Sequence, residues 1–185
     1  MKIGVYVGSF NPPHLGHIKC AQYLIDNNYV DKVLMLPTTN YWNKQNLVSI
    51  FHRVNMLRFY ETDKIIVDDI HNNYLYSYMV LESIHKDYPK DALYLIIGAD
   101  NLEKFHLWKR LDIIFKYKII VLNRNGDDYF KYLNNYNNNK DKFIILSNFQ
   151  SIDISSTIIR NNLNSKYISD RVRKYIVENN LYNKE

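Results

Sequence analysis

Two histidines three positions apart follow a loop of glycine, serine and proline near the beginning of the sequence, Gly8-Ser9-Phe10-Asn11-Pro12-Pro13-His14-Leu15-Gly16-His17. Gly8 permits a turn with positive φ after an apolar run, and the amides of the next three residues can then face an anion. The two prolines stiffen the loop. His14 and His17 flank the expected start of a helix, where free amides and the helix dipole favour a bound phosphate. The motif therefore predicts a phosphate site with two imidazole donors.

These residue types suit the transfer of a nucleotidyl group. That reaction needs alignment of the attacking phosphate and neutralisation of charge on the pentavalent phosphorus and the leaving pyrophosphate, which histidine, lysine, arginine and Mg²⁺ can provide. Gly16 has no Cβ, so a flat adenine ring could pack against the helix backbone there. Two histidines beside a glycine also occur by coincidence, and it is the loop before them that favours catalysis.

The elements that must position these residues alternate along the chain. Short apolar runs predict strands at 3–7, 32–36, 65–67, 93–97, 118–122 and 143–146. Helical patterns cover 16–28, a segment capped by Ser49, 76–85, 107–115, 129–133 and two pieces from Ser156 onward, the last with Val172, Ile176 and Val177 facing inward. This alternation predicts an α/β fold, a doubly wound parallel sheet with helices on both faces.

Residues 1–185 are expected to form a single domain with a helical carboxyl-terminal portion from about residue 156, because the length suits one hydrophobic core. The Asn-rich stretch 134–139 is expected to form a solvated loop. In doubly wound sheets, ligands bind beyond the carboxyl ends of the strands. Gly8, Pro37 and Gly98 directly follow three of the expected strands, so we expect the site there.

Composition limits the class of function. The net charge of +5 favours an anionic ligand, but the Lys and Arg residues are scattered, which argues against a nucleic-acid partner. Cys20 is the only cysteine, so an internal disulfide and a structural zinc site are excluded and a reducing cytoplasm is expected. No apolar run approaches ~20 residues, so we expect a soluble protein with no membrane partner. Association into a homo-oligomer stays open.

The His14-Leu15-Gly16-His17 element resembles the signature of the HxGH nucleotidyltransferase superfamily. Within it, the chain is most similar to bacterial nicotinate-mononucleotide adenylyltransferases, through the segments Ile96–Leu102 with Phe105 and Trp108, Ile154–Arg160, Tyr175-Ile176 and Leu181-Tyr182. The resemblance spans nearly the whole chain. It implies a Rossmann-like fold and a Mg²⁺-dependent transfer of AMP from ATP to a pyridine mononucleotide, nicotinate mononucleotide.

The resemblance also implies roles for particular residues. Catalysis falls to His14, His17, Arg160 and Lys44. Binding of ATP falls to Gly8, Ser9, Phe10, His14, Gly16, His17, Gly98, Asp100, Ile154, Ser156, Thr157 and Arg160, with Asp100 on a ribose. Binding of the acceptor falls to Ser9, Phe10, Asn11, Lys44, Tyr76, Ser77 and Trp108, with Trp108 stacked on the pyridine ring. No side chain is implied as a metal ligand.

One motif departs from the family and keeps the acceptor open. The family's Pro-Pro-His-Lys is Tyr41-Trp42-Asn43-Lys44 in this sequence, and Arg53 matches an arginine in the helix that follows. Nicotinamide mononucleotide and phosphopantetheine remain alternative acceptors. A nucleotide-binding module without catalysis is an alternative of another class. An RNA-binding domain would explain the positive charge, but no stacked-aromatic RNA motif accompanies it.

Overall fold

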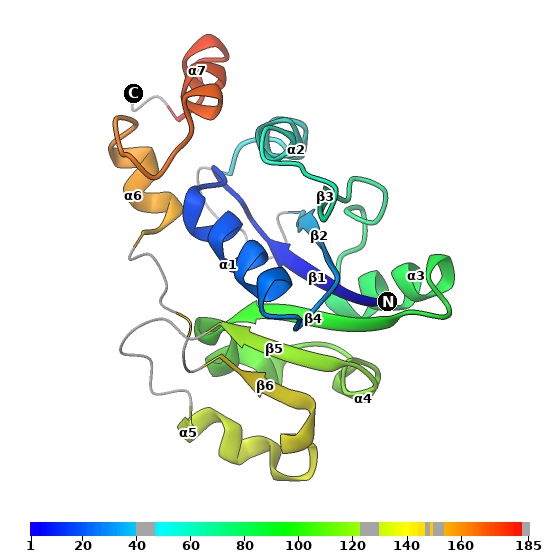
Figure 1. Cartoon of the computed structure of the whole chain (residues 1–185). Coiled ribbons are helices and arrows are strands. Elements are labelled where there is room, and N and C mark those ends of the chain that lie inside the picture. The colour runs from blue at the N-terminus through cyan, green and yellow to red at the C-terminus, as the bar shows by residue number, and fades with distance from the viewer. Residues whose placement is uncertain (40–46, 123–129, 147–148, 150–153, 183–185) are drawn as a thin grey trace.

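The computed structural model describes residues 1–39, 47–122, 130–146, 149 and 154–182. Within these residues one parallel sheet has the order β3-β2-β1-β4-β5-β6. Its strands are β1 (Lys2–Gly8), β2 (Lys32–Pro37), β3 (Ile65–Val67), β4 (Ala92–Gly98), β5 (Lys118–Leu122) and β6 (Phe143–Ile145). The chain runs outward from β1 to β3, returns to place β4 beside β1, and then runs outward the other way (Figure 1). This is the Rossmann-like order, which confirms the expected fold class.

Alternate residues of the central strands serve two cores, one on each face of the sheet. In β4, Leu95 and Ile97 belong to one core and Ile96 to the other, because successive side chains of a strand point to opposite faces. The first core is covered by α3 (Ser77–Asp87), the 3-10 helix η1 (Ala99–Leu107), α4 (Leu111–Ile114) and α5 (Phe130–Leu133). The second is covered by α1 (Leu15–Asp26) and α2 (Ile50–Arg58).

A third, smaller core holds the carboxyl-terminal helices α6 (Ser156–Asn161) and α7 (Asp170–Glu178). Ile159, Val172 and Ile176 are fully buried in it, together with Met56 of α2. Figure 1 shows α6 and α7 on the side of the molecule where α1 begins. This small core therefore brings the last part of the chain close to the first loop.

Serine side chains mark the beginnings of three of these helices. Ser49, Ser155 and Ser169 each accept a hydrogen bond from the amide three residues later, which satisfies one of the free amides at a helix start. The expected cap at Ser49 is thus confirmed. None of the helices in the described part of the chain is long and apolar enough to cross a membrane.

The expected helix over 107–115 is largely wrong. Leu107 ends η1, Trp108 is extended (φ −70°, ψ 138°), and only Leu111–Ile114 form an α-helical turn. Arg110 has a left-handed backbone (φ 54°), and its guanidinium donates to both carboxylate oxygens of Asp112 at 2.9 and 2.8 Å. A left-handed residue breaks a right-handed helix. The apolar residues of this segment therefore have helical spacing, but the left-handed backbone at Arg110 prevents a continuous helix.

Two expectations about the second half of the chain are also wrong. The stretch 134–139 is not a loop but lies within the 3-10 helix η2 (Asn134–Lys142), although most of its asparagines are exposed to solvent as expected. Its one aromatic residue, Tyr136, is 8% exposed and packs 5.5 Å from Phe105, so it fixes the polar stretch against the core. Val177 was expected to face inward but is 63% exposed. Val172 and Ile176 lie four positions apart on the buried face of α7. Val177 follows Ile176 directly, so its side chain points to another face of the helix.

Candidate active site

A cleft of about 590 Å³ lies at the carboxyl ends of the strands. Its walls include Gly8, Gly98 and Leu122, which end β1, β4 and β5, and Thr38, which follows β2. The neighbours β1 and β4 mark the point where the strand order reverses. Ligands bind at this point in doubly wound sheets, and the volume is that of a small-molecule site.

The loop from Gly8 to His14 forms one wall of the cleft. Its left-handed residue is Phe10 (φ 46°), whereas Gly8 was expected to supply the positive φ and does not. The Phe10 ring is 1% exposed and lies edge-on to Tyr6 and His17, at 5.5 and 4.9 Å between centroids. Burial of this ring sets the turn. Gly8 is needed for space instead, because a Cβ there would lie 2.8 Å from the Phe10 ring.

The two histidines of the motif lie with their rings stacked, 3.7 Å between centroids. His14 precedes α1 and is 4% exposed. His17, one turn into the helix, accepts the backbone N–H of His14 on Nδ1 at 3.2 Å. Because this bond occupies the lone pair of Nδ1, the neutral ring of His17 carries its proton on Nε2. His17 is thus fixed as a donor at the other edge of its ring.

Helix α6 is joined to the loop by two hydrogen bonds. Ser156 Oγ donates to the carbonyl of Pro12 at 2.9 Å, and Arg160 Nη1 donates to that of Asn11 at 2.6 Å. Arg160 Nη2 also donates to Thr157 Oγ1 at 3.0 Å, so these side chains share one face of α6 as their spacing predicts. Two motifs that lie at opposite ends of the sequence therefore form one wall.

The segment after β4 supplies another part of the cleft. Asn101 Nδ2 donates to the carbonyl of Gly98 at 3.3 Å and to Asp100 Oδ1 at 3.4 Å, which fixes the beginning of η1. A Cβ on Gly98 would meet Asp100 Oδ1, so a larger residue there would force this carboxylate to shift. Trp108, at the end of η1, is half-buried and packs 5.1 Å from Phe105.

The beginning of α3 contributes Tyr76 and Ser77 to the lining. The carbonyl of Tyr76 accepts the amides of Met79 and Val80 at 3.0 and 3.2 Å. The amides of Ser77 and Tyr78 come before the first such bond, in the part of a helix where amides have no carbonyl of the same helix to bond. Free amides of this kind can bind an anion.

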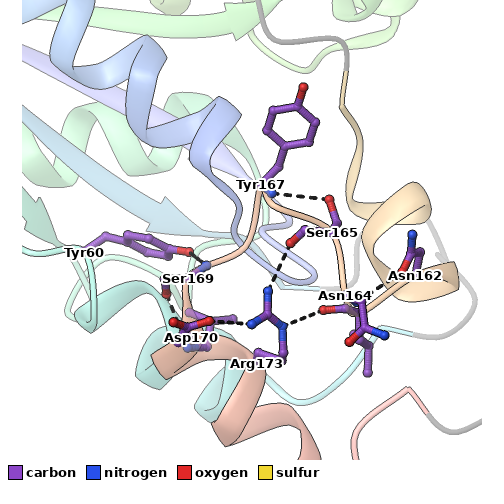
Figure 2. Close-up of polar contacts among 10 residues, drawn as sticks. Tyr60, Asn162, Asn164, Ser165, Tyr167, Ser169, Asp170 and Arg173 are labelled. Carbon is purple, nitrogen blue, oxygen red and sulfur yellow. Dashed lines mark hydrogen bonds and ion pairs between the residues drawn. The ribbon is translucent and has the colours of Figure 1, made fainter.

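The connection between α6 and α7 fixes the first residue of α1. The amide of Leu15, inside the histidine motif, donates to the carbonyl of Tyr167 at 2.8 Å. Figure 2 shows that Arg173 donates to two backbone carbonyls of this connection, at 2.8 and 3.2 Å, and forms an ion pair with Asp170. The hydroxyl of Tyr60 accepts a further amide of the connection at 3.1 Å. The start of α1 is thus held from the carboxyl-terminal portion.

Every predicted site residue that the structure describes lines this cleft: Gly8, Ser9, Phe10, Asn11, His14, Gly16, His17, Tyr76, Ser77, Gly98, Asp100, Trp108, Ile154, Ser156, Thr157 and Arg160. Lys44 and Trp42 lie outside the described residues. The lining also includes residues that the sequence did not single out for the site, among them Thr38, Thr39, Leu75, Asn101, Leu107 and Lys109. Lys109 directly follows Trp108, and its charge next to a predicted stacking residue was a signal that could have found it.

The described lining carries more positive than negative charge. Besides the two histidines, the described lining has two cationic side chains, Lys109 and Arg160, and one carboxylate, Asp100. Such a lining suits a polyphosphate. In the described part of the chain, no three His, Cys, Asp or Glu residues are grouped as a metal site.

Comparison with known proteins assigns the chain to a class and then to a family. The cytidylyltransferase-like family model matches residues 5–162. The chain is 35% identical, over 96% of both chains, to the "probable nicotinate-nucleotide adenylyltransferase" of Acholeplasma laidlawii, and 30% identical, over 98% of both, to the nicotinate-nucleotide adenylyltransferase of Bacillus subtilis. It therefore belongs to the nicotinate-nucleotide adenylyltransferase family.

A solved structure shares the fold. The nicotinic acid mononucleotide adenylyltransferase of Plasmodium falciparum, complexed with NaAD, superimposes with a TM-score of 0.80 over 98% of this chain and 97% of that one, at 21% identity. The likeness extends over the carboxyl-terminal helices as well as the sheet, because almost the whole of both chains is covered.

Proposed function

We propose that the chain transfers AMP from ATP to nicotinate mononucleotide, giving nicotinate adenine dinucleotide and pyrophosphate, a step of NAD biosynthesis. The observation that carries the proposal is the junction of the histidine loop with α6, through Asn11–Arg160 and Pro12–Ser156, on a cleft that Trp108 also lines. Donors for a triphosphate and an aromatic platform for a pyridine ring therefore share one space. The single cysteine supports a reducing, cytoplasmic setting.

In this reaction a phosphate oxygen of the acceptor forms a bond to the α-phosphorus of ATP. The bond from that phosphorus to the bridging oxygen breaks, and pyrophosphate leaves with the electron pair. No protein side chain needs to be covalently modified, so catalysis consists of alignment and charge stabilisation.

We assign the roles as follows. His14 and His17 donate to phosphate oxygens of ATP, and Arg160 adds a cation beside Thr157 on the same wall. Gly16 admits the adenine, and Asp100 accepts from a ribose hydroxyl. Ser9, Phe10 and Asn11 with Lys44 contact the acceptor's phosphate and ribose. Trp108 stacks on the pyridine ring, and the first amides of α3, near Tyr76 and Ser77, bind the carboxylate.

Mg²⁺ fits this site as an ion that ATP brings with it. Mg²⁺ in nucleotide sites takes most of its ligands from phosphates and water, so it needs no cluster of carboxylates from the protein. Bound there, the ion would neutralise triphosphate charge. The residues of the chain then need only orient the two substrates and donate hydrogen bonds.

Pyrophosphate release tests the proposal directly. The purified protein is incubated with ATP and Mg²⁺ and with nicotinate mononucleotide, nicotinamide mononucleotide or phosphopantetheine in separate assays. We expect the highest kcat/KM with nicotinate mononucleotide. Absence of pyrophosphate with all three acceptors would support a non-catalytic nucleotide-binding module. A preference for nicotinamide mononucleotide would keep the chemistry and overturn the assigned acceptor.

Replacement of Trp108 by alanine should weaken acceptor binding. Stacking of a base on an aromatic ring contributes about 1–3 kcal/mol, so we expect the KM for nicotinate mononucleotide to rise by about tenfold or more, with little change in the KM for ATP. Trp108→Phe is the matched control, because it keeps an aromatic face and the contact with Phe105. Equal acceptor KM values for the wild type and Trp108→Ala would contradict the stacking role.

A further inference from the structure

Asn11 of the histidine loop is held from outside the cleft as well as from inside it. The side chain is 5% exposed, and its Oδ1 accepts two hydrogen bonds, from the hydroxyl of Tyr182 at 2.9 Å and from the amide of Val48 at 3.2 Å. Its carbonyl accepts Arg160 at 2.6 Å. Asn11 and Arg160 line the cleft, whereas Tyr182 and Val48 do not. Asn11 therefore has hydrogen bonds both to a residue that lines the cleft and to residues outside it.

Arg53 adds a second contact from the same outer side. This residue of α2 is 2% exposed, and its guanidinium donates to the carbonyls of Ser9 at 2.8 Å and Val48 at 3.0 Å. Burial lowers the pKa of Arg53 from its usual value, since a desolvated cation is disfavoured. Among the residues that the structure describes, no carboxylate forms an ion pair with it. A buried cation that bonds backbone carbonyls fixes the backbone of the loop.

Tyr182 reaches Asn11 because the chain turns sharply after α7. Its backbone is left-handed (φ 62°), and the preceding Leu181 is 8% exposed in the small core with Ile176. Burial raises the pKa of the Tyr182 hydroxyl above its usual value, so it stays protonated and able to donate at neutral pH. An amide oxygen such as Asn11 Oδ1 can only accept, so its bond to Tyr182 requires the protonated hydroxyl.

We propose that Tyr182 is a positioning residue for catalysis, acting through Asn11 to hold the histidine loop in the conformation that aligns the reacting phosphates. The proposal rests on the proposed function. It does not give Tyr182 any contact with substrate. The Tyr182 hydroxyl affects turnover only through its hydrogen bond to Asn11 of the loop. On either side of Asn11 the loop is held by the Arg53–Ser9 bond and the Ser156–Pro12 bond.

The test is the isosteric change Tyr182→Phe, which removes only the hydroxyl. We expect kcat for pyrophosphate release with nicotinate mononucleotide to fall about tenfold, since small displacements of aligning groups cost up to about 10²-fold. The matched control is Tyr175→Phe. That hydroxyl also joins the carboxyl-terminal portion to α2, at 2.9 Å from His52 Nδ1 and 3.1 Å from Asn55 Nδ2, but not to the loop. It should leave kcat unchanged.

A double-mutant cycle separates positioning from general stability. In an Asn11→Ala protein, the further change Tyr182→Phe should lower kcat by less than about twofold, because the bond it removes is already absent. A tenfold fall in both backgrounds, or a wild-type kcat for Tyr182→Phe, would overturn the proposal. An equal loss in Tyr182→Phe and Tyr175→Phe would also overturn it, since it would indicate a structural effect of either hydroxyl.

Amide hydrogen exchange supplies a measurement that does not depend on the reaction. In Tyr182→Phe, exchange should become faster at residues 8–11, with β4 and β5 unchanged. Uniformly faster exchange, or no change at the loop, would contradict the positioning role. If the wild type releases no pyrophosphate with any acceptor, the proposed function fails, while the exchange result still decides whether Tyr182 holds the loop. The same holds if Asn11→Ala is too unstable to assay.

Discussion

Replacement of His17 by alanine should lower kcat by about 10²-fold or more, the loss typical of removing one donor to transition-state charge. His17 is the better of the two histidines for this test. Its Nδ1 accepts the His14 amide at 3.2 Å, so a neutral ring carries its proton on Nε2, the group that we assign to a phosphate oxygen. We expect the KM for nicotinate mononucleotide to change by less than about threefold, because a donor that acts mainly in the transition state affects kcat.

The helix-capping bond of His17 calls for a second variant. His17→Ala removes the acceptor for the His14 amide as well as the donor, and loss of such a cap costs about 1 kcal/mol of stability. His17→Asn can accept that amide again but cannot reach as far as Nε2. We therefore expect His17→Asn to recover part of the melting temperature and none of the turnover. Recovery of kcat together with stability would show that His17 acts only on the helix start.

The order and type of most elements follow from local patterns. Strands buried on both faces are continuous apolar runs, as in residues 93–97, and serine caps mark helix starts, as at Ser49 and Ser155. The misplaced segments are those in which one residue overrides the local pattern. Arg110 breaks a helical spacing by a left-handed backbone, and Tyr136 anchors an Asn-rich stretch to the core by its ring alone. Neither a backbone angle nor a tertiary partner is encoded in the spacing of apolar residues.

The sequence could group the residues that line the cleft, because its walls are made of motifs whose residues are close in sequence. The histidine loop and the segment from Ile154 to Arg160 each carry their own signal, and the strand ends bring them together. The supports behind the loop were not predicted. Arg53 and Tyr182 contact it through side chains 44 and 171 residues away in sequence, and nothing in their neighbourhood indicates that contact. Such pairs become visible only when the chain is folded.

Replacement of Gly16 by alanine should lower kcat/KM by about 10²-fold without unfolding the protein. A Cβ at position 16 would lie 2.9 Å from His14 Nδ1, 3.0 Å from His14 Cε1 and 3.0 Å from Ile154 Cγ2. The His14 ring cannot yield easily, since it is 4% exposed and stacked on His17 at 3.7 Å. The methyl group would therefore displace an imidazole of the motif, and displacements of about 1 Å cost up to about 10²-fold. It would also occupy the space that we assign to adenine.

Activity should fall in this variant while stability changes little, which makes the result specific. Alanine is favoured over glycine inside a helix by about 1 kcal/mol, and this gain opposes the crowding at His14. Gly4→Ala is the matched control, because its Cβ would lie 2.7 Å from Ile96 Cδ1 and neither Gly4 nor Ile96 lines the cleft. We expect Gly4→Ala to lower the melting temperature and leave kcat unchanged. We expect Gly16→Ala to lower kcat and leave the melting temperature nearly unchanged. Wild-type kcat and ATP KM in Gly16→Ala would show that neither His14 nor adenine needs the space that this glycine leaves open.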